Sequence, residues 1–196
     1  YLNRLSHYWK WLLDREEVQI NVWERVKVTV PRKTSEDEVR PFTDDEILRL
    51  LNGPAPQRLH DLMMLGALTG ARLDVLVSLR VGDALVDAHG IQCFLFPPRK
   101  KETKERLCPV HPDLREIVER RTNGRRPEDH FFPEWPPVKK EGSKRERSFK
   151  ASNQFTAYRR EVGVDDTPPG ASRSRVVFHS FRHWFITMAE RAGQPE

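Results

Sequence analysis

The sequence lacks the features that mark several classes of protein. It has only two cysteines, Cys93 and Cys108, which are too few for a disulfide scaffold or a zinc cluster and fit a reducing cytoplasm. No stretch approaches the roughly 20 apolar residues of a membrane-spanning helix, so we expect no membrane association. The chain starts without Met and without the apolar run of a signal peptide. Together with the abrupt Gly193–Glu196 end, this start predicts that both ends were trimmed.

The composition is that of a basic, water-soluble chain with a modest core. Its 196 residues, 37% hydrophobic and 32% charged, are enough for one domain and a smaller appendage. The formal net charge is +5, and the sequence pI is about 9.4. This balance favours a polyanionic partner, although many basic proteins bind none, so the charge alone leaves both possibilities open.

Three segments differ in composition. Residues 1–27 begin with a predicted helix over residues 1 to about 17, because its large apolar side chains recur at helical spacing. This helix either packs on the main domain or ends a separate helical domain upstream, and we favour the second interpretation. Residues 28–41 are polar and charged and are predicted to be a linker. Residues 42–196 form the predicted main domain.

The main domain is predicted to be mainly α with a small antiparallel β-hairpin or sheet. Helices are expected from a capping box at Thr43 and Glu46, over residues 59–68 and 73–79, after His111, and over residues 148–162 and 180–192. Strands are expected over 91–96 and 106–110, and irregular segments over 133–147 and 165–176. The predicted central core consists of Leu62, Met63, Leu65, Leu68, Leu76, Leu79, Phe181, Phe185 and Met188.

Three short segments carry side chains suited to phosphate chemistry. Arg72 follows a turn at Gly70 and stands at a helix start, where backbone N–H groups favour an anion. The hairpin tip from Arg99 to Arg106 is rich in Lys and Arg. It is either a finger that binds DNA or an ordinary charged turn. His179 and Arg182 lie three residues apart at a helix start and can face one side. Each pattern alone is common.

Metal binding by the second helix start is not favoured. His179 and His183 are four residues apart, but Ser180 stands where the His-Glu-x-x-His zinc motif has its acid. We therefore expect neither a metal nor another cofactor.

Taken together, the segments resemble the tyrosine recombinase (phage integrase) family. Residues 69–73 with Leu79, Arg80 and Asp83 resemble its first arginine box, in which a TG-x-R turn leads into a helix ending in LR-x-x-D. Residues 101–109 resemble its hairpin, whose catalytic lysine lies eight residues before a proline, a register that selects Lys101. Residues 179–185 resemble its H-x-L-R-H-x-F box. The resemblance covers roughly residues 42–196.

The resemblance implies a fold, a reaction and a set of site residues. The fold is that of the family's catalytic domain, preceded by the end of its core-binding domain. The reaction is site-specific cleavage and rejoining of double-stranded DNA through a 3′-phosphotyrosyl intermediate, by a tetramer on DNA and without a cofactor. Arg72, Lys101, His179 and Arg182 would be catalytic. Arg99, Lys100, Lys104, Arg106 and His183 would contact DNA.

Two departures from the family pattern limit this interpretation. The family usually has an acidic residue three positions after the first arginine, where this chain has Val75. The tyrosines are Tyr1, Tyr8 and Tyr158, and none follows the His179 box. The nucleophile is therefore expected beyond Glu196, and residues 1–196 alone are expected to bind DNA without cleaving it. The alternatives are a type IB topoisomerase-like enzyme and a non-catalytic DNA-binding remnant of an integrase.

Overall fold

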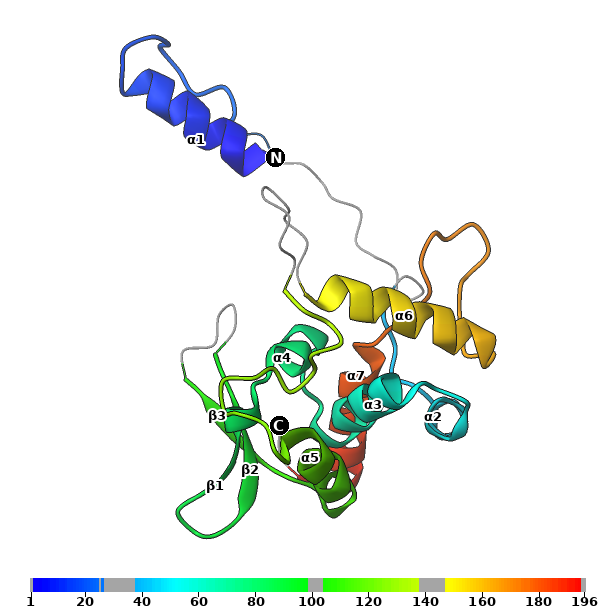
Figure 1. Ribbon diagram of the computed structural model, residues 1–196. Coiled ribbons are helices and arrows are strands. Elements are labelled where there is room, and N and C mark those ends of the chain that lie inside the picture. Colours follow the sequence, from blue (N-terminus) through cyan, green and yellow to red (C-terminus); the bar gives the residue numbers. More distant parts are fainter. Residues whose placement is uncertain (1, 25, 27–37, 99–103, 138–146, 195–196) are drawn as a thin grey trace. The chain divides into compact units, whose positions relative to one another are not determined.

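The computed structural model describes residues 2–24, 26, 38–98, 104–137 and 147–194 (Figure 1). The chain divides into two compact units, residues 1–35 and 36–196. The predicted linker falls largely on residues 27–37, outside the described residues, so its nature stays a prediction.

The first unit is built on helix α1, Leu2–Leu13. The helix ends earlier than the predicted residue 17, and Glu16 adopts a left-handed conformation with φ of 59°. The chain then folds back along the helix. Asn21 Nδ2 donates to the Ser6 carbonyl oxygen at 3.0 Å, and the rings of Trp9 and Trp23 pack edge to face at 6.0 Å. Hydrogen bonding and aromatic packing thus hold the non-helical return segment against α1.

The second unit begins with three helices. Helix α2 (Asp44–Asn52) has the predicted capping box, in which Thr43 and Glu46 satisfy each other's backbone N–H groups. Helix α3 (Gln57–Thr69) is largely buried, and helix α4 (Leu73–Ser78) follows after a turn. The remaining helices are α5 (Arg115–Thr122), entered through the 3-10 turn η3 (Pro112–Leu114), α6 (Ser148–Glu161) and α7 (Ser180–Arg191). Helix α7 packs along α3 (Figure 1).

A three-stranded antiparallel sheet is inserted between α4 and α5. Its strands, β1 (Ala84–Val86), β2 (Gln92–Phe96) and β3 (Arg106–Pro109), lie in the order β1-β2-β3. Phe94 of the central strand is opposite Ala84 on one side and Cys108 on the other. The predicted β2–β3 hairpin is confirmed. Strand β1 was missed, because three residues are too few to show an alternating pattern.

The core joins the helices to the inner face of the sheet. Leu62, Met63, Leu65, Leu76, Leu79 and Phe181 are buried as predicted. Leu68 packs at the edge of this core. The prediction was wrong for Phe185 and Met188, which are only partly buried. Both lie on the part of α7 that leaves the core: Phe185 covers the Gly70 turn, and Met188 lines a surface groove with Trp184.

Among the helices that the structure describes, none combines the length and the apolar character needed to cross a bilayer.

Candidate functional site

A tight turn between α3 and α4 positions the first candidate residue, Arg72. Gly70 ends α3 in the left-handed region, with φ of 59° and ψ of 15°, where a side chain is costly. The Thr69 hydroxyl stabilises the turn. It donates to the Leu65 carbonyl oxygen at 2.6 Å and accepts from the Ala71 N–H at 3.2 Å. The chain then straightens, and Arg72, half-buried, stands at the N-cap of α4.

Helix α7 brings the second box to the same turn. The guanidinium of Arg182 donates from one terminal nitrogen to the carbonyl oxygen of Gly70 at 2.8 Å. Phe185, one helical turn later, lies directly against Gly70, where an added Cβ would come within 2.6 Å of its Cδ1. The Arg182 guanidinium is therefore bonded to the backbone of Gly70, which is two residues before Arg72 in the chain. The structure thus joins the two arginine boxes.

His179 stands at the start of α7 and is exposed. The residue after it, Ser180, is fully buried, and its hydroxyl accepts the N–H of Val177 at 3.1 Å. His183, one turn further on, is half-buried and packs its ring edge to face against that of His179, with centroids 4.9 Å apart. The two imidazoles and Arg182 thus occupy one end of α7, the end with the positive helix dipole.

The predicted basic hairpin is described only in part. Arg99, Lys100 and Lys101 lie outside the described residues, so the positions of the predicted lysine and its neighbours stay predictions. Lys104 and Arg106 are exposed on the return side of the hairpin. The guanidinium of Arg106 lies 6.0 Å from the Phe96 ring centroid, the outer limit of a cation–π contact.

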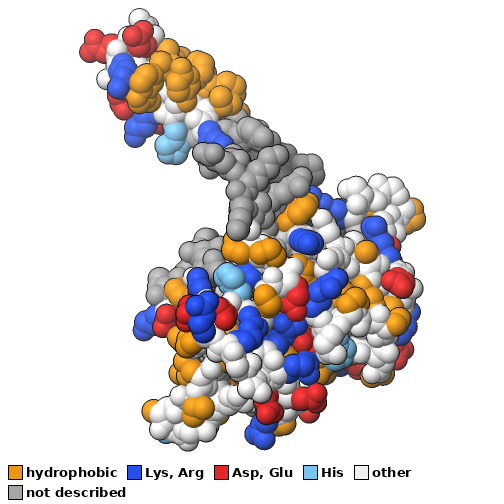
Figure 2. All heavy atoms as spheres, viewed as in Figure 1, with side chains coloured by type: hydrophobic (Ala, Val, Ile, Leu, Met, Phe, Trp, Pro, Cys, Tyr) orange, Lys and Arg blue, Asp and Glu red, His pale blue; other side chains and the backbone are white. Residues whose placement is uncertain are grey.

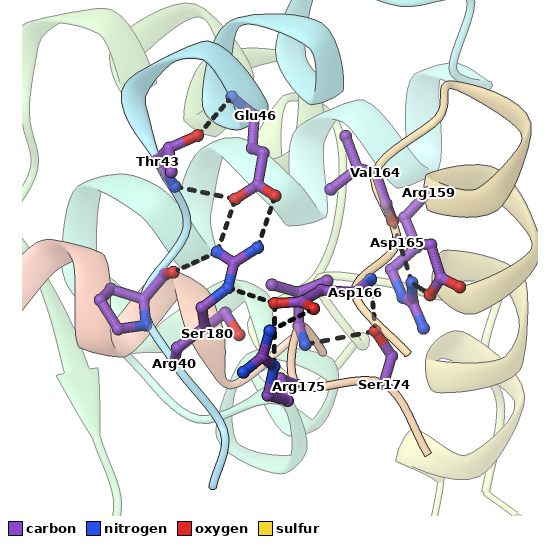
Figure 3. Close-up of polar contacts among 12 residues, drawn as sticks. Arg40, Thr43, Glu46, Arg159, Val164, Asp165, Asp166, Ser174, Arg175 and Ser180 are labelled. Carbon is purple, nitrogen blue, oxygen red and sulfur yellow. Dashed lines mark hydrogen bonds and ion pairs between the residues drawn. The ribbon is translucent and has the colours of Figure 1, made fainter. Parts of the chain in front are cut away.

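A network of four charged side chains supports the segment that leads into His179 (Figure 3). Arg40 makes a two-pronged contact with Glu46 of α2 at 2.8 and 2.9 Å and donates through Nε to Asp166 at 2.6 Å. Asp166 also accepts two bonds from Arg175, at 2.6 and 3.0 Å. These charge-assisted bonds close the base of the loop between α6 and α7.

The network fixes acid–base properties as well as shape. Bonds from Arg40 and Arg175 hold the pKa values of Glu46 and Asp166, respectively, below the usual range for carboxyl groups. Sequence patterns did not predict this network, because the bonded pair Arg40 and Asp166 is 126 residues apart and shares no local pattern.

The donor groups of the described residues were compared with those of metal sites. Among the described residues, no group of three or more His, Cys, Asp or Glu side chains could hold an ion. The chemistry of the site is that of arginine and histidine side chains and a helix N-terminus, which together suit an oxyanion.

Comparison with known proteins places these boxes in a family. Residues 39–195 match the phage integrase family. The chain belongs to the phage integrase family of tyrosine recombinases. The family match spans both arginine boxes, the sheet and helices α2 to α7. A comparison with curated protein sequences gives no match.

Solved integrase structures share the fold. The integrase of mycobacterium phage Brujita is 22% identical, with a TM-score of 0.56 over 98% of this chain and 57% of that one. A lambda integrase dimer (residues 75–356) bound to a COC′ core site is 17% identical, with a TM-score of 0.69 over 98% of this chain and 66% of that one. The lambda integrase catalytic core is 20% identical, with a TM-score of 0.54 over 78% of this chain and 84% of that one. This integrase-family chain therefore spans less than two thirds of the first two relatives.

Two residues of this integrase-family chain have roles set by burial. Val75, at the position where the family usually has an acid, has no exposed surface and belongs to the core. Tyr158 is 4% exposed, and its hydroxyl donates to the Leu50 carbonyl oxygen at 2.8 Å. Burial also raises the pKa of Tyr158, which disfavours the phenolate. The Tyr158 hydroxyl thus ties α6 to α2.

Proposed function

We propose that this chain provides the phosphate-binding half of a site-specific DNA recombinase. The observation that carries the proposal is the hydrogen bond from Arg182 to Gly70, which holds the guanidinium of the second box at the turn presenting Arg72. Two arginines beside a helix N-terminus suit the two non-bridging oxygens of a scissile phosphodiester, whose charge increases in the transition state.

In this proposal a tyrosine is the nucleophile, and Lys101 and His179 act in proton transfer. A tyrosine attacks the phosphorus and forms a 3′-phosphotyrosyl bond while the 5′-oxygen leaves. Lys101 donates a proton to that oxygen, and His179 assists proton transfer or orients the phosphate. A 5′-hydroxyl of another duplex then attacks the phosphotyrosine and releases the enzyme. The cations stabilise the charge, so the scheme requires no metal.

The nucleophile comes from sequence outside residues 1–196. Among the tyrosines, Tyr158 is buried and bonded to Leu50, and the other two precede both arginine boxes. Residues 1–196 are therefore proposed to bind double-stranded DNA without cleaving it. The protein containing the tyrosine would act as a tetramer on DNA. The lambda integrase tetramer bound to a Holliday junction has this fold, at 18% identity and a TM-score of 0.67.

The test separates binding from chemistry. Purified residues 1–196 should raise the fluorescence anisotropy of a labelled duplex DNA. The affinity should be weak and should fall steeply with salt concentration. They should form no covalent adduct with a nicked duplex that traps the phosphotyrosine. In the protein that includes the tyrosine, Arg182→Lys should lower adduct formation by about 100-fold or more, because lysine lacks the planar guanidinium. Robust cleavage by residues 1–196 would overturn the assignment of the nucleophile.

One observation favours a second candidate function, DNA binding without catalysis. Val75 is fully buried where the family usually has an acid, so position 75 supplies no carboxylate to the candidate site. If the tyrosine-containing protein binds DNA but forms no adduct on any nicked duplex, the non-catalytic function is the correct one.

A further inference from the structure

A second group of basic side chains lies outside the candidate site. Arg80 follows helix α4, His130 precedes the buried Phe131, and Arg147 comes just before α6. Arg80 and His130 pair their backbones in an isolated antiparallel bridge. One terminal nitrogen of Arg147 lies 2.6 Å from His130 Nδ1. We name these three residues the Arg80 cluster.

Backbone carbonyl groups hold the side chains of the cluster in place. Arg147 donates through Nε to the Trp135 carbonyl oxygen and through its other terminal nitrogen to that of Phe132, the latter at 2.8 Å. Arg80 donates to the carbonyl oxygen of Glu128 at 2.6 Å. A carbonyl group has no net charge, so these bonds fix the guanidinium groups without neutralising them.

Three carboxylates near the cluster are engaged in bonds of their own: Asp83 accepts the backbone N–H of Arg80 at 2.7 Å, and two others pair with arginines outside the cluster. Asp129 pairs with Arg126 at 3.2 Å, and Glu134 pairs with Arg121 at 3.3 Å. Figure 2 shows that Lys and Arg side chains on the visible face of the second unit are interspersed with acidic ones. The formal charge of the whole chain therefore does not locate a ligand site. The ligand site is instead inferred from the local arrangement of the cations and the bonded carboxylates.

The cations of the cluster repel one another. Burial and then the charge of Arg147 and Arg80 lower the pKa of His130. Burial and then the charge of Arg80 lower the pKa of Arg147. Cationic groups held close together in this way favour the binding of an anion, and groups with shifted pKa values are frequent at functional sites.

Donor groups remain on the cluster for a ligand. Arginine has five N–H groups in a planar fork, and three of those on Arg147 are used by Trp135, Phe132 and His130. Because arginine can only donate, Nδ1 of His130 accepts, which places the ring proton of the neutral imidazole on Nε2. Two guanidinium groups and an imidazole N–H match the oxygens of a phosphate.

We propose that the Arg80 cluster binds a backbone phosphate of double-stranded DNA, distinct from the phosphate held by Arg72 and Arg182. Helix α4, six residues and about 9 Å long, lies in the chain between Arg72 and Arg80. One strand of B-DNA advances roughly 3.4 Å per nucleotide, so about three nucleotides cover the length of that helix, and the proposal assigns the two phosphates to one duplex. The identity of the ligand rests on the proposed function.

The first test is the salt dependence of duplex binding by residues 1–196. Loss of one phosphate contact should lower the slope of log affinity against log salt by about 1. We expect this change in Arg147→Gln and in Arg80→Gln. The matched control is Arg58→Gln, which removes the same charge from an exposed side chain at the opposite end of α3 from Gly70. The control should keep the wild-type slope.

The second test identifies the phosphate and guards against misfolding. A panel of duplexes, each with one neutral methylphosphonate, should include a position that weakens binding by the wild type but not by Arg147→Gln. Arg147→Lys keeps the charge and should keep most of the slope, with thermal melting reporting on its fold. Equal slopes for Arg147→Gln and Arg58→Gln, in folded variants, overturn the cluster site. Absence of wild-type duplex binding would instead refute the proposed function itself.

Discussion

Arg182 donates a hydrogen bond to the carbonyl oxygen of Gly70 across 2.8 Å, joining segments that are 112 residues apart in the sequence. The contact links a side chain of α7 to the backbone of the turn that presents Arg72. The candidate site is therefore a product of tertiary packing between α3 and α7. Neither box forms it alone.

Replacing Gly70 should disturb this turn more than its size suggests. The left-handed φ of 59° costs a residue with a Cβ about 1–2 kcal/mol, and the added atom would lie 2.6 Å from Phe185 Cδ1. We expect Gly70→Ala to lower the free energy of unfolding by about 2–4 kcal/mol in urea denaturation. Gly124→Ala is the control, since Gly124 has φ of 69° with open space around it. If both variants lose the same stability, Phe185 does not restrain the turn.

An acid at position 75 should not restore the family pattern. Val75 has no exposed surface, and a carboxylate buried without a partner is strongly destabilising. We expect Val75→Asp to lower the free energy of unfolding by about 3–5 kcal/mol, more than Val75→Ala at about 2 kcal/mol. Chemical denaturation and duplex titration measure the two effects. A stable Val75→Asp protein with tighter DNA binding would contradict this prediction and would indicate that Arg72 can recruit the carboxylate.

Stability should fall in acid through the loop carboxylates. Arg175 and Arg40 lower the pKa of Asp166, and Arg159 lowers that of Asp165 to about 2. Because the folded pKa values lie below the unfolded value of about 3.9, this stabilisation is complete above that value and is lost as the pH falls through the folded pKa values.

Urea denaturation between about pH 6 and 2 checks this dependence. Asp166→Asn should lose less stability over that range than the wild type, because one of the responsible groups is already neutral. Asp113→Asn, at a side chain that is 68% exposed, should follow the wild-type curve. A steeper acid transition in Asp166→Asn than in the wild type would show that the network does not stabilise the fold.

Tyr158→Phe should change stability and leave DNA chemistry unchanged. The variant loses the hydrogen bond to the Leu50 carbonyl oxygen, which costs about 1–2 kcal/mol because a buried acceptor loses its donor. Adduct formation by the tyrosine-containing protein, measured on the nicked duplex, should stay within about twofold of the wild type. Loss of adduct formation in a folded Tyr158→Phe protein would contradict this prediction and point to Tyr158 as the nucleophile.

The sequence predicted features that depend on neighbouring residues. The capping box at Thr43, the helices on either side of Gly70 and the β2–β3 hairpin follow from local patterns of polar, apolar and turn residues. The family motifs located Arg72, His179 and Arg182 because spacing along the chain is a local property. Their assigned roles in catalysis stay predictions.

Features that depend on tertiary packing were missed or misplaced. Periodicity placed Phe185 in the core, because it cannot show where α7 leaves the core for the Gly70 turn. The Arg40–Asp166 pair spans 126 residues and has no local signature. The Arg80 cluster was missed for the same reason, since Arg147 reaches His130 from a segment 17 residues away. Such groups can be found by searching a three-dimensional structure for arginines that are buried or bonded to backbone carbonyl groups.

The bond between Arg182 and Gly70 also sets when the site can exist. A ribosome that has translated Arg72 must add about 110 further residues before Arg182 is made, which takes roughly 6–22 seconds at about 5–20 residues per second. Until then the nascent chain has only one of the two arginines of the candidate site, on an incomplete core. The proposed phosphate site is therefore complete only after synthesis has passed α7.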